Sequence, residues 1–246
     1  CYPGENNGVI EQWVMWYILE LEMYLKRRKD NREYFKSFCY KYINYLSGFD
    51  CGNGLITRPN GWNFIEWSDA NEFAEESDIS YPTNMLYARV LEAGGNIYDD
   101  AQLNEKAAKV KKCIVAKSFN GEYFCDGAAL RGNEYVNLPN TSEACQYYAA
   151  FTGTAYEENA DYNKFFDNFY NVLGYARKLE RKLPEVAFAN LFVGFTVRFM
   201  YLLNNGNFDR LLNEITEFYG PMAKQTGTLW EQETPFASLN HGLSSD

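Results

Sequence analysis

Apolar side chains recur at helical spacing in one segment after another, and this periodicity constrains the fold more than any other feature of the sequence. In the first segment Ile10, Trp13, Tyr17 and Leu21 stand three or four residues apart, as on one face of an amphipathic helix. Alternation of apolar and polar residues never runs long enough to build a sheet, although Glu122 to Cys125 fits a short hairpin arm. The periodicity therefore predicts an all-α protein.

The helical segments come in pairs joined by short turns, and longer polar loops separate the pairs. Two helices joined by a short turn form an antiparallel hairpin. About eight helices in four hairpins are expected, with a pause at Gly94-Gly95-Asn96, and the loops after Gly48, Asn120 and Gly220 should emerge at one end of a helical toroid. The expected pairs cover 10–25 and 35–46, 81–93 and 100–118, 142–152 and 162–176, and 186–203 and 208–219.

Composition narrows the classes of partner. With 23 Lys and Arg against 33 Asp and Glu, the net charge of −10 would repel nucleic acid and anionic membranes. No apolar run reaches the roughly 20 residues that span a bilayer. Aromatic residues make up 17% of the chain, enough to supply both a large core and stacking faces for carbohydrate. The sequence does not predict the cellular compartment of the protein.

The six cysteines do not form a CxxC pair or a Cys/His ligand spacing, so a zinc or iron–sulfur site is not expected. Free thiols are expected, and disulfide pairing stays open because spacing does not reveal it. Between Glu66 and Asp78 six carboxylates cluster; they could coordinate calcium, but a solvated loop is the favoured interpretation. No cofactor and no metal site is predicted.

A loop near the C-terminal end concentrates chemically useful residues. Gly227 to Pro235 contains Trp230 and Glu231, and Asn240 and His241, the single histidine, follow directly. An indole ring stacks on the C–H face of a pyranose, and a carboxylate beside it accepts a proton. The alternative is a core tryptophan next to a solvated or capping acid.

A second long loop, Phe49 to Ser80, carries Trp62, Glu66, Trp67 and Asp69 within eight residues. Loops of this length inside a compact domain are uncommon unless they are functional. The pattern favours a ligand loop, and a packed Ω-loop with surface acids is the alternative.

With these loops in place, the chain resembles the catalytic domain of the α-L-rhamnosidases of glycoside hydrolase family 78, which fold as an (α/α)6 barrel. The resemblance covers almost the whole chain. It rests on five motifs in order: Tyr2-Pro3 through Val9-Ile10, Gly61-Trp62-Asn63-Phe64-Ile65-Glu66-Trp67, Gly121-Glu122-Tyr123-Phe124-Cys125-Asp126, Thr141-Ser142-Glu143-Ala144-Cys145-Gln146, and Gly227-Thr228-Leu229-Trp230-Glu231 with Ser238-Leu239-Asn240-His241.

The resemblance implies an inverting hydrolase of terminal α-L-rhamnosides, with two carboxyl groups about 6.5–9.5 Å apart. By resemblance Glu231 matches the general base. The substrate-binding positions would be Trp230 and Trp67, which match stacking positions, His241, which matches a substrate contact, and Trp62, Glu66, Asp69 and Asn240.

Two departures qualify this interpretation. The family's general acid lies in an acid-rich motif before the Tyr-Pro segment, so the acid is expected upstream of Cys1. Eight helices fall short of the twelve in an (α/α)6 barrel, so residues 1–246 are interpreted as a partial barrel domain, truncated at both ends, whose hydrolysis should be severely impaired if the chain acts alone.

Two other functions stay open. The same aromatic loops could serve a non-catalytic carbohydrate-binding or scaffold domain. Another (α/α)6 enzyme, such as an unsaturated uronyl hydrolase or a sugar epimerase, is the third hypothesis; the single histidine counts against an epimerase, and the net charge of −10 counts against an anionic uronate substrate.

Overall fold

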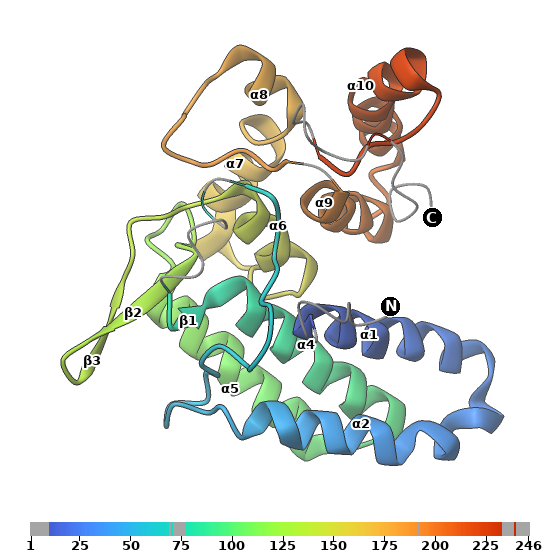
Figure 1. Ribbon diagram of the computed structural model, residues 1–246, viewed down its shortest axis with the longest axis vertical. Helices are drawn as coiled ribbons and strands as arrows, with labels where there is room; N and C mark the ends of the chain where they lie inside the picture. The colour runs from blue at the N-terminus through green and yellow to red at the C-terminus, as the bar shows by residue number, and fades with distance from the viewer. Residues whose placement is uncertain (1–9, 69, 71–76, 191, 233–238, 240–246) are drawn as a thin grey trace. The chain divides into compact units, whose positions relative to one another are not determined.

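The computed structural model describes residues 10–68, 70, 77–190, 192–232 and 239, and these contain nine α-helices and a three-stranded sheet (Figure 1). The chain divides into two compact units. Unit 1 comprises Cys1–Phe64, Ala74–Phe119 and Gly127–Leu138, and unit 2 comprises Ile65–Phe73, Asn120–Asp126 and Pro139–Asp246. The predicted predominance of antiparallel helical hairpins is confirmed, while the assignment of 1–246 to one domain stays a prediction.

The helices of unit 1 are α1 (Glu11–Arg27), α2 (Arg32–Ser47), α4 (Tyr81–Tyr98) and α5 (Ala101–Ser118). Helix α4 is central, because α1, α2 and α5 all pack against it (Figure 1). The Ser80 side chain accepts the backbone N–H of Thr83 and so caps the helix, and Pro82 stands in the first turn, where its missing N–H costs no hydrogen bond. Nearly every residue of α4 is buried.

The predicted pause at Gly94-Gly95 is wrong, because α4 continues through both glycines to Tyr98. A Cβ on Gly94 would lie 2.8 Å from the Ile43 side chain of α2, and one on Gly95 would overlap the Asn104 side chain of α5. These glycines therefore allow α4 to approach its neighbours closely and do not end the helix.

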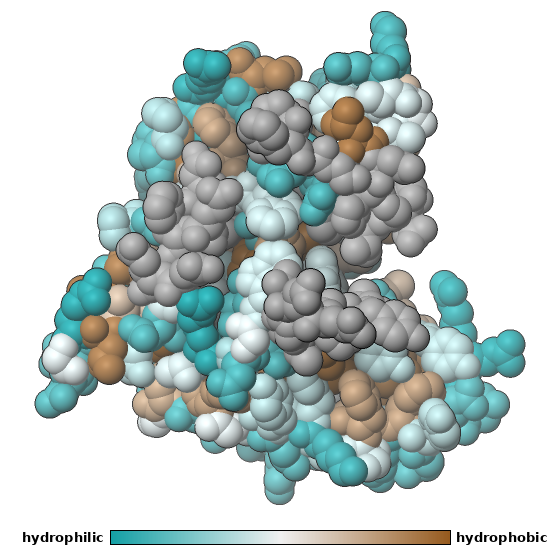
Figure 2. Space-filling model, in the orientation of Figure 1, coloured by the Kyte–Doolittle hydropathy of each residue, from teal (hydrophilic) through white to brown (hydrophobic). Residues whose placement is uncertain are grey.

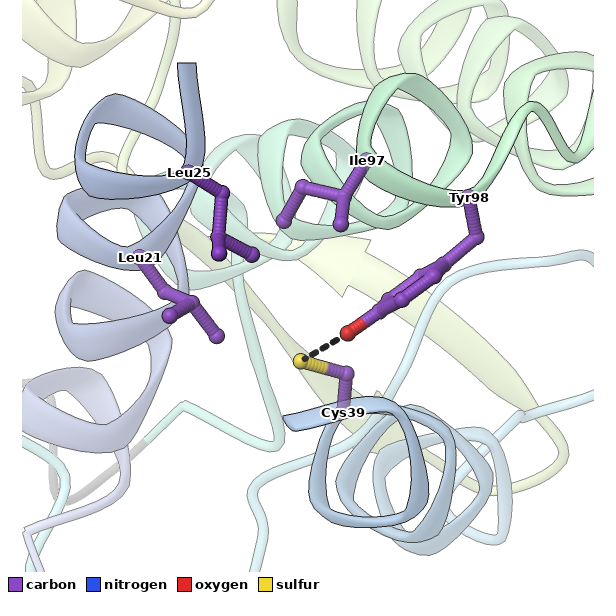
Figure 3. Packing of buried hydrophobic residues seen from close by; sticks show 5 residues of the cluster. All are labelled: Leu21, Leu25, Cys39, Ile97 and Tyr98. Carbon is purple, nitrogen blue, oxygen red and sulfur yellow. Dashed lines mark hydrogen bonds between the residues drawn. The ribbon is translucent and has the colours of Figure 1, made fainter. Parts of the chain in front are cut away.

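One end of unit 1 is closed by a small apolar cluster from three helices (Figure 3). Leu21 and Leu25 point from α1, Cys39 from α2, and Ile97 and Tyr98 from the last turn of α4. The Tyr98 hydroxyl donates to the Cys39 sulfur at 3.7 Å, so the one polar atom of the ring is satisfied inside the cluster.

A short antiparallel sheet, which the periodicity did not predict, also belongs to unit 1. Strand β2 (Gly127–Arg131) pairs with both β1 (Ile79–Ser80) and β3 (Glu134–Asn137). The hairpin therefore lies just after the predicted arm at Glu122 to Cys125. Hydrophobic side chains gather over this hairpin (Figure 2), where Leu130 and Val136 are about half exposed.

Unit 2 contains α6 (Glu143–Phe151), α7 (Asn163–Asn171), α8 (Tyr175–Glu180), α9 (Phe192–Asn204) and α10 (Phe208–Thr226). Helix α9 packs against α6 and α10. Phe195 of α9 contacts Phe218 of α10 with 4.1 Å between ring centroids. The helix predicted over 162–176 is divided, because Gly174 adopts a φ of 125° that other residues avoid, and α7 and α8 result.

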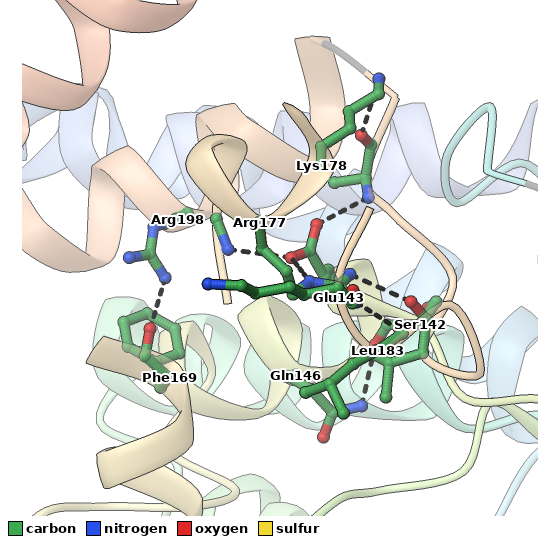
Figure 4. A network of polar contacts seen from close by, with 12 residues as sticks. Ser142, Glu143, Gln146, Phe169, Arg177, Lys178, Leu183 and Arg198 are labelled. Carbon is green, nitrogen blue, oxygen red and sulfur yellow. Dashed lines mark hydrogen bonds and ion pairs between the residues drawn. The ribbon is translucent and has the colours of Figure 1, made fainter. Parts of the chain in front are cut away.

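A buried ion pair fixes the loop that precedes α9 (Figure 4). One Glu143 oxygen accepts the Gly174 N–H at 2.8 Å and the Arg177 Nε–H at 3.0 Å, and the other accepts the Ala189 N–H at 2.8 Å. Arg177 also donates to three carbonyls of one loop, those of Lys182, Leu183 and Val186. The loop continues through Val186 to Asn190, where the first turns of a helix over 186–203 were predicted. Helix α9 therefore begins only at Phe192.

Two further observations concern the described residues. Cys39, Cys51, Cys113, Cys125 and Cys145 are free thiols. No helix among the described residues combines the length and the apolar character needed to cross a membrane.

Candidate functional site

The segment that follows α10 carries the two best sequence candidates. Gly227 ends the helix in the left-handed conformation, with a φ of 72°, and redirects the chain. The indole Nε1–H of Trp230 donates to the Thr226 hydroxyl at 2.8 Å, which ties the ring back to the last turn of α10. Trp230 and Glu231 are both half-buried, so each has surface available to a ligand.

Glu66, predicted as a sugar contact, is an interior residue of unit 2. Its side chain is only 2% exposed. One oxygen accepts the backbone N–H of Trp67 at 2.7 Å, and the other accepts the N–H of Gly194 in the first turn of α9. The carboxyl group thus caps a helix from a distant part of the chain.

Burial raises the pKa of Glu66 to about 8, although the N–H groups of Gly194 and Trp67 and the charge of Lys178 act in the opposite direction. A raised pKa is typical of the general acid of a glycosidase. The geometry does not suit that role here, because both oxygens are engaged by backbone N–H groups and almost no surface is exposed.

The pKa of Glu66 predicts a specific pH dependence of stability. A folded-state pKa above the ordinary value of 4.5 means that the folded protein binds the proton more tightly, so stability is lost as the pH rises from 4.5 to about 8. In Glu66→Gln the side-chain amide does not ionise in this pH range, so this variant is the reference. We expect the unfolding free energy of the wild type, measured in urea relative to Glu66→Gln, to fall across this window and to be constant on either side; a difference that rises with pH would contradict the assignment.

Two segments of unit 2 that carry predicted residues make hydrogen bonds at the start of α9. Glu66 lies against Gly194, as described above, and Trp67 follows Glu66 directly in the chain. Just before the helix, the Asn190 amide donates to the Gln232 side-chain oxygen at 3.4 Å, and this links the Trp230–Glu231 segment to the same place. Two segments that are far apart in the sequence therefore converge on one helix terminus, each carrying a tryptophan.

Trp62 lies in unit 1, in contact with other aromatic side chains. Its ring centroid is 5.4 Å from that of Phe64, which in turn lies 5.9 Å from the ring of Trp13 in α1. The backbone of Trp62 forms a bridge with Ile10. Its predicted role in sugar binding stays a prediction.

Three predicted substrate-binding residues, Asp69, Asn240 and His241, fall outside the described residues. The acidic cluster considered for calcium falls largely outside them as well, and its first member, Glu66, is committed to backbone N–H groups. Among the described residues no group of three or more His, Cys, Asp or Glu side chains is placed to hold a metal ion.

Sequence reasoning missed the residues that organise this site: Lys178, Asn190 and Gly194. Gly194 gave a usable signal, because a glycine inside a helical pattern often marks a close approach of another group. Lys178 donates to the Ala189 carbonyl at 3.4 Å, and its charge acts to lower the pKa of Glu66, but nothing in the local sequence predicts this.

Comparisons with known proteins agree with this fold. No family model and no curated protein sequence matches the chain. A GH78 family rhamnosidase of Bacillus sp. GL1 is similar in structure with a TM-score of 0.70 and 16% identity, over 88% of this chain and 22% of that one. A rhamnosidase from Klebsiella oxytoca, solved with rhamnose bound, is similar with a TM-score of 0.70 and 14% identity, over 97% of this chain and 46% of that one.

The chain therefore has the fold of the helical domain of GH78 rhamnosidases, and it spans less than half the length of either of these proteins. The predicted resemblance is confirmed at the level of the fold.

Proposed function

We propose that this chain forms a rhamnoside site of a glycoside hydrolase that inverts the anomeric centre of terminal α-L-rhamnosides. Glu231 acts as the general base that deprotonates the attacking water, while Trp230 and Trp67 stack on the sugar. Asp69, Asn240 and His241 bind hydroxyl groups. We do not assign the general acid to a described residue. Glu66 does not suit this role, because both of its oxygens accept backbone N–H groups.

One observation carries the proposal: the convergence of the Trp67 segment and the Trp230–Glu231 segment on the start of α9, within a fold shared with rhamnosidases. Aromatic faces beside a carboxylate suit a neutral sugar, and the net charge of −10 presents no obstacle to one.

The test combines binding and turnover on the same preparation. Isothermal titration with L-rhamnose, beside L-fucose as a control deoxysugar, measures recognition. Release of p-nitrophenol from its α-L-rhamnoside measures hydrolysis, and because p-nitrophenolate departs with little protonation, this substrate tests the base without requiring the acid. Selective rhamnose binding or turnover would support the site; a chain that does neither would refute it.

Trp230 offers a direct test of stacking. We expect Trp230→Ala to weaken rhamnose binding up to about tenfold, as a lost aromatic contact does, whereas Trp230→Phe should keep most of the affinity. Both variants lose the indole bond to Thr226, so their difference isolates the aromatic face. Equal affinities of the two variants in the titration would exclude Trp230 from stacking.

A non-catalytic carbohydrate-binding domain is the second candidate. It is favoured by the placement of Glu66, since this carboxyl group, at the start of α9, accepts backbone N–H groups with both oxygens and is not placed to protonate a leaving group. Selective rhamnose binding without any p-nitrophenol release would distinguish this function.

A further inference from the structure

Glu66 reaches the first turn of α9 only because residue 194 is a glycine. A Cβ placed on Gly194 would lie 2.5 Å from the Glu66 carboxylate oxygen and 3.1 Å from the Ala189 side chain. A methyl carbon and a carboxylate oxygen that are not bonded do not approach to 2.5 Å. The Glu66 side chain is therefore long enough to reach residue 194 only where that residue has no side chain. Neither residue can be enlarged without displacing the other.

The surroundings hold this contact in place. Ala189, five residues before Gly194, is fully buried, and two charged side chains reach it: Glu143 accepts its N–H at 2.8 Å, and Lys178 donates to its carbonyl at 3.4 Å (Figure 4). The segment 189–194 is thus held at both ends, by Glu143 and Lys178 at one and by Glu66 at the other.

The contact also controls the neighbouring tryptophan. The second Glu66 oxygen accepts the backbone N–H of Trp67 itself, so the carboxyl group fixes the peptide that carries the indole ring. Glu66 does not need to touch a sugar to affect binding, because a shift of its carboxyl group would strain or break its hydrogen bond with the Trp67 N–H.

We propose that Glu66 and Gly194 form a size-matched lock that sets the position of Trp67, which makes Glu66 a positioning residue and not a sugar ligand. The functional part of this inference rests on the proposed function, in which Trp67 stacks on the sugar. The structural part is independent of it.

A double-mutant cycle tests the lock itself. Gly194→Ala should lower the urea midpoint of unfolding, and Glu66→Asp, which withdraws the carboxyl group by one methylene, should make room for the added methyl group. We therefore expect the double variant to recover most of the loss caused by Gly194→Ala. Gly220→Ala in α10, where a Cβ meets nothing within 4 Å, is the matched control and should not lower the midpoint.

The position of Trp67 is read separately from stability. In protein labelled with 15N-tryptophan, the indole resonance of Trp67 is assigned by its absence from Trp67→Phe. We expect Gly194→Ala to shift this resonance and to weaken rhamnose binding up to about tenfold, while Gly220→Ala changes neither. If Gly194→Ala does not fold, the Trp67 resonance and rhamnose binding are measured in Glu66→Asp and in the double variant, and a Trp67 resonance at its wild-type position in Glu66→Asp would overturn the lock.

The outcomes separate the two proposals. Additive effects in the cycle, or a Trp67 resonance that stays in place in Gly194→Ala, would overturn the lock even if rhamnose binds. Coupled effects in the cycle and a shifted Trp67 resonance in Gly194→Ala would support the lock. If the wild type does not bind rhamnose in the same experiments, the proposed function is refuted. Coupling, a shifted resonance and weakened binding together support both.

Discussion

Replacing Glu143 with alanine is expected to lower the free energy of unfolding by about 3–5 kcal/mol, a large fraction of the total for a domain. The side chain of Arg177 is 2% exposed, so removal of its partner leaves a cation inside the protein. The N–H groups of Gly174 and Ala189 lose their acceptor in the same substitution. The loop before α9 loses its tether as well.

Urea unfolding followed by circular dichroism measures this loss. The matched control is Glu180→Ala, which removes a carboxylate from the same unit, at the end of the helix α8 that carries Arg177. Glu180 pairs with Lys182 at 2.5 Å, but the two side chains are 55% and 69% exposed, and such pairs contribute about 0–1 kcal/mol. Losses of equal size in the two variants would show that Glu143 is not a structural centre of unit 2.

The helices of this protein could be predicted from sequence because their apolar faces are periodic over several turns. Leu21, which belongs to the first predicted stripe, is buried, whereas Tyr17 of the same stripe is 41% exposed. The ends of helices were less predictable. Gly94 and Gly95 predicted a break in the helix, but in the structure they allow α4 to approach α2 and α5 closely. This role depends on tertiary packing, which local propensity does not reveal. The Gly132-Asn133 pair between β2 and β3 was a turn signal that could have indicated the hairpin.

The candidate site was predictable where its chemistry is local. Trp230 and Glu231 are adjacent, so their combination was visible in the sequence. The role of Glu66 was not, because its second partner, Gly194, stands 128 residues further along the chain. A carboxylate in an aromatic loop gives the same sequence pattern whether it faces a ligand or caps a buried helix, and burial alone distinguishes the two.

Replacing Glu231 with glutamine is expected to lower the turnover of p-nitrophenyl α-L-rhamnoside by about 10²–10⁴-fold, which is the usual contribution of a general base. Glutamine has nearly the same size and keeps one acceptor oxygen, but it cannot take a proton from the attacking water. Because Glu231 is half-buried and lies outside any regular element, we expect the unfolding free energy to change by no more than about 0.5 kcal/mol.

The decisive feature of this prediction is how the loss divides between kinetic constants. A base acts on water in the transition state and not on the bound sugar, so kcat should fall while the rhamnose affinity stays nearly constant. Glu217→Gln removes an exposed carboxylate from α10 of the same unit and should retain full turnover. If Glu231→Gln instead weakens rhamnose binding and leaves kcat unchanged, then Glu231 is a sugar ligand, and the base must be sought in another carboxyl group.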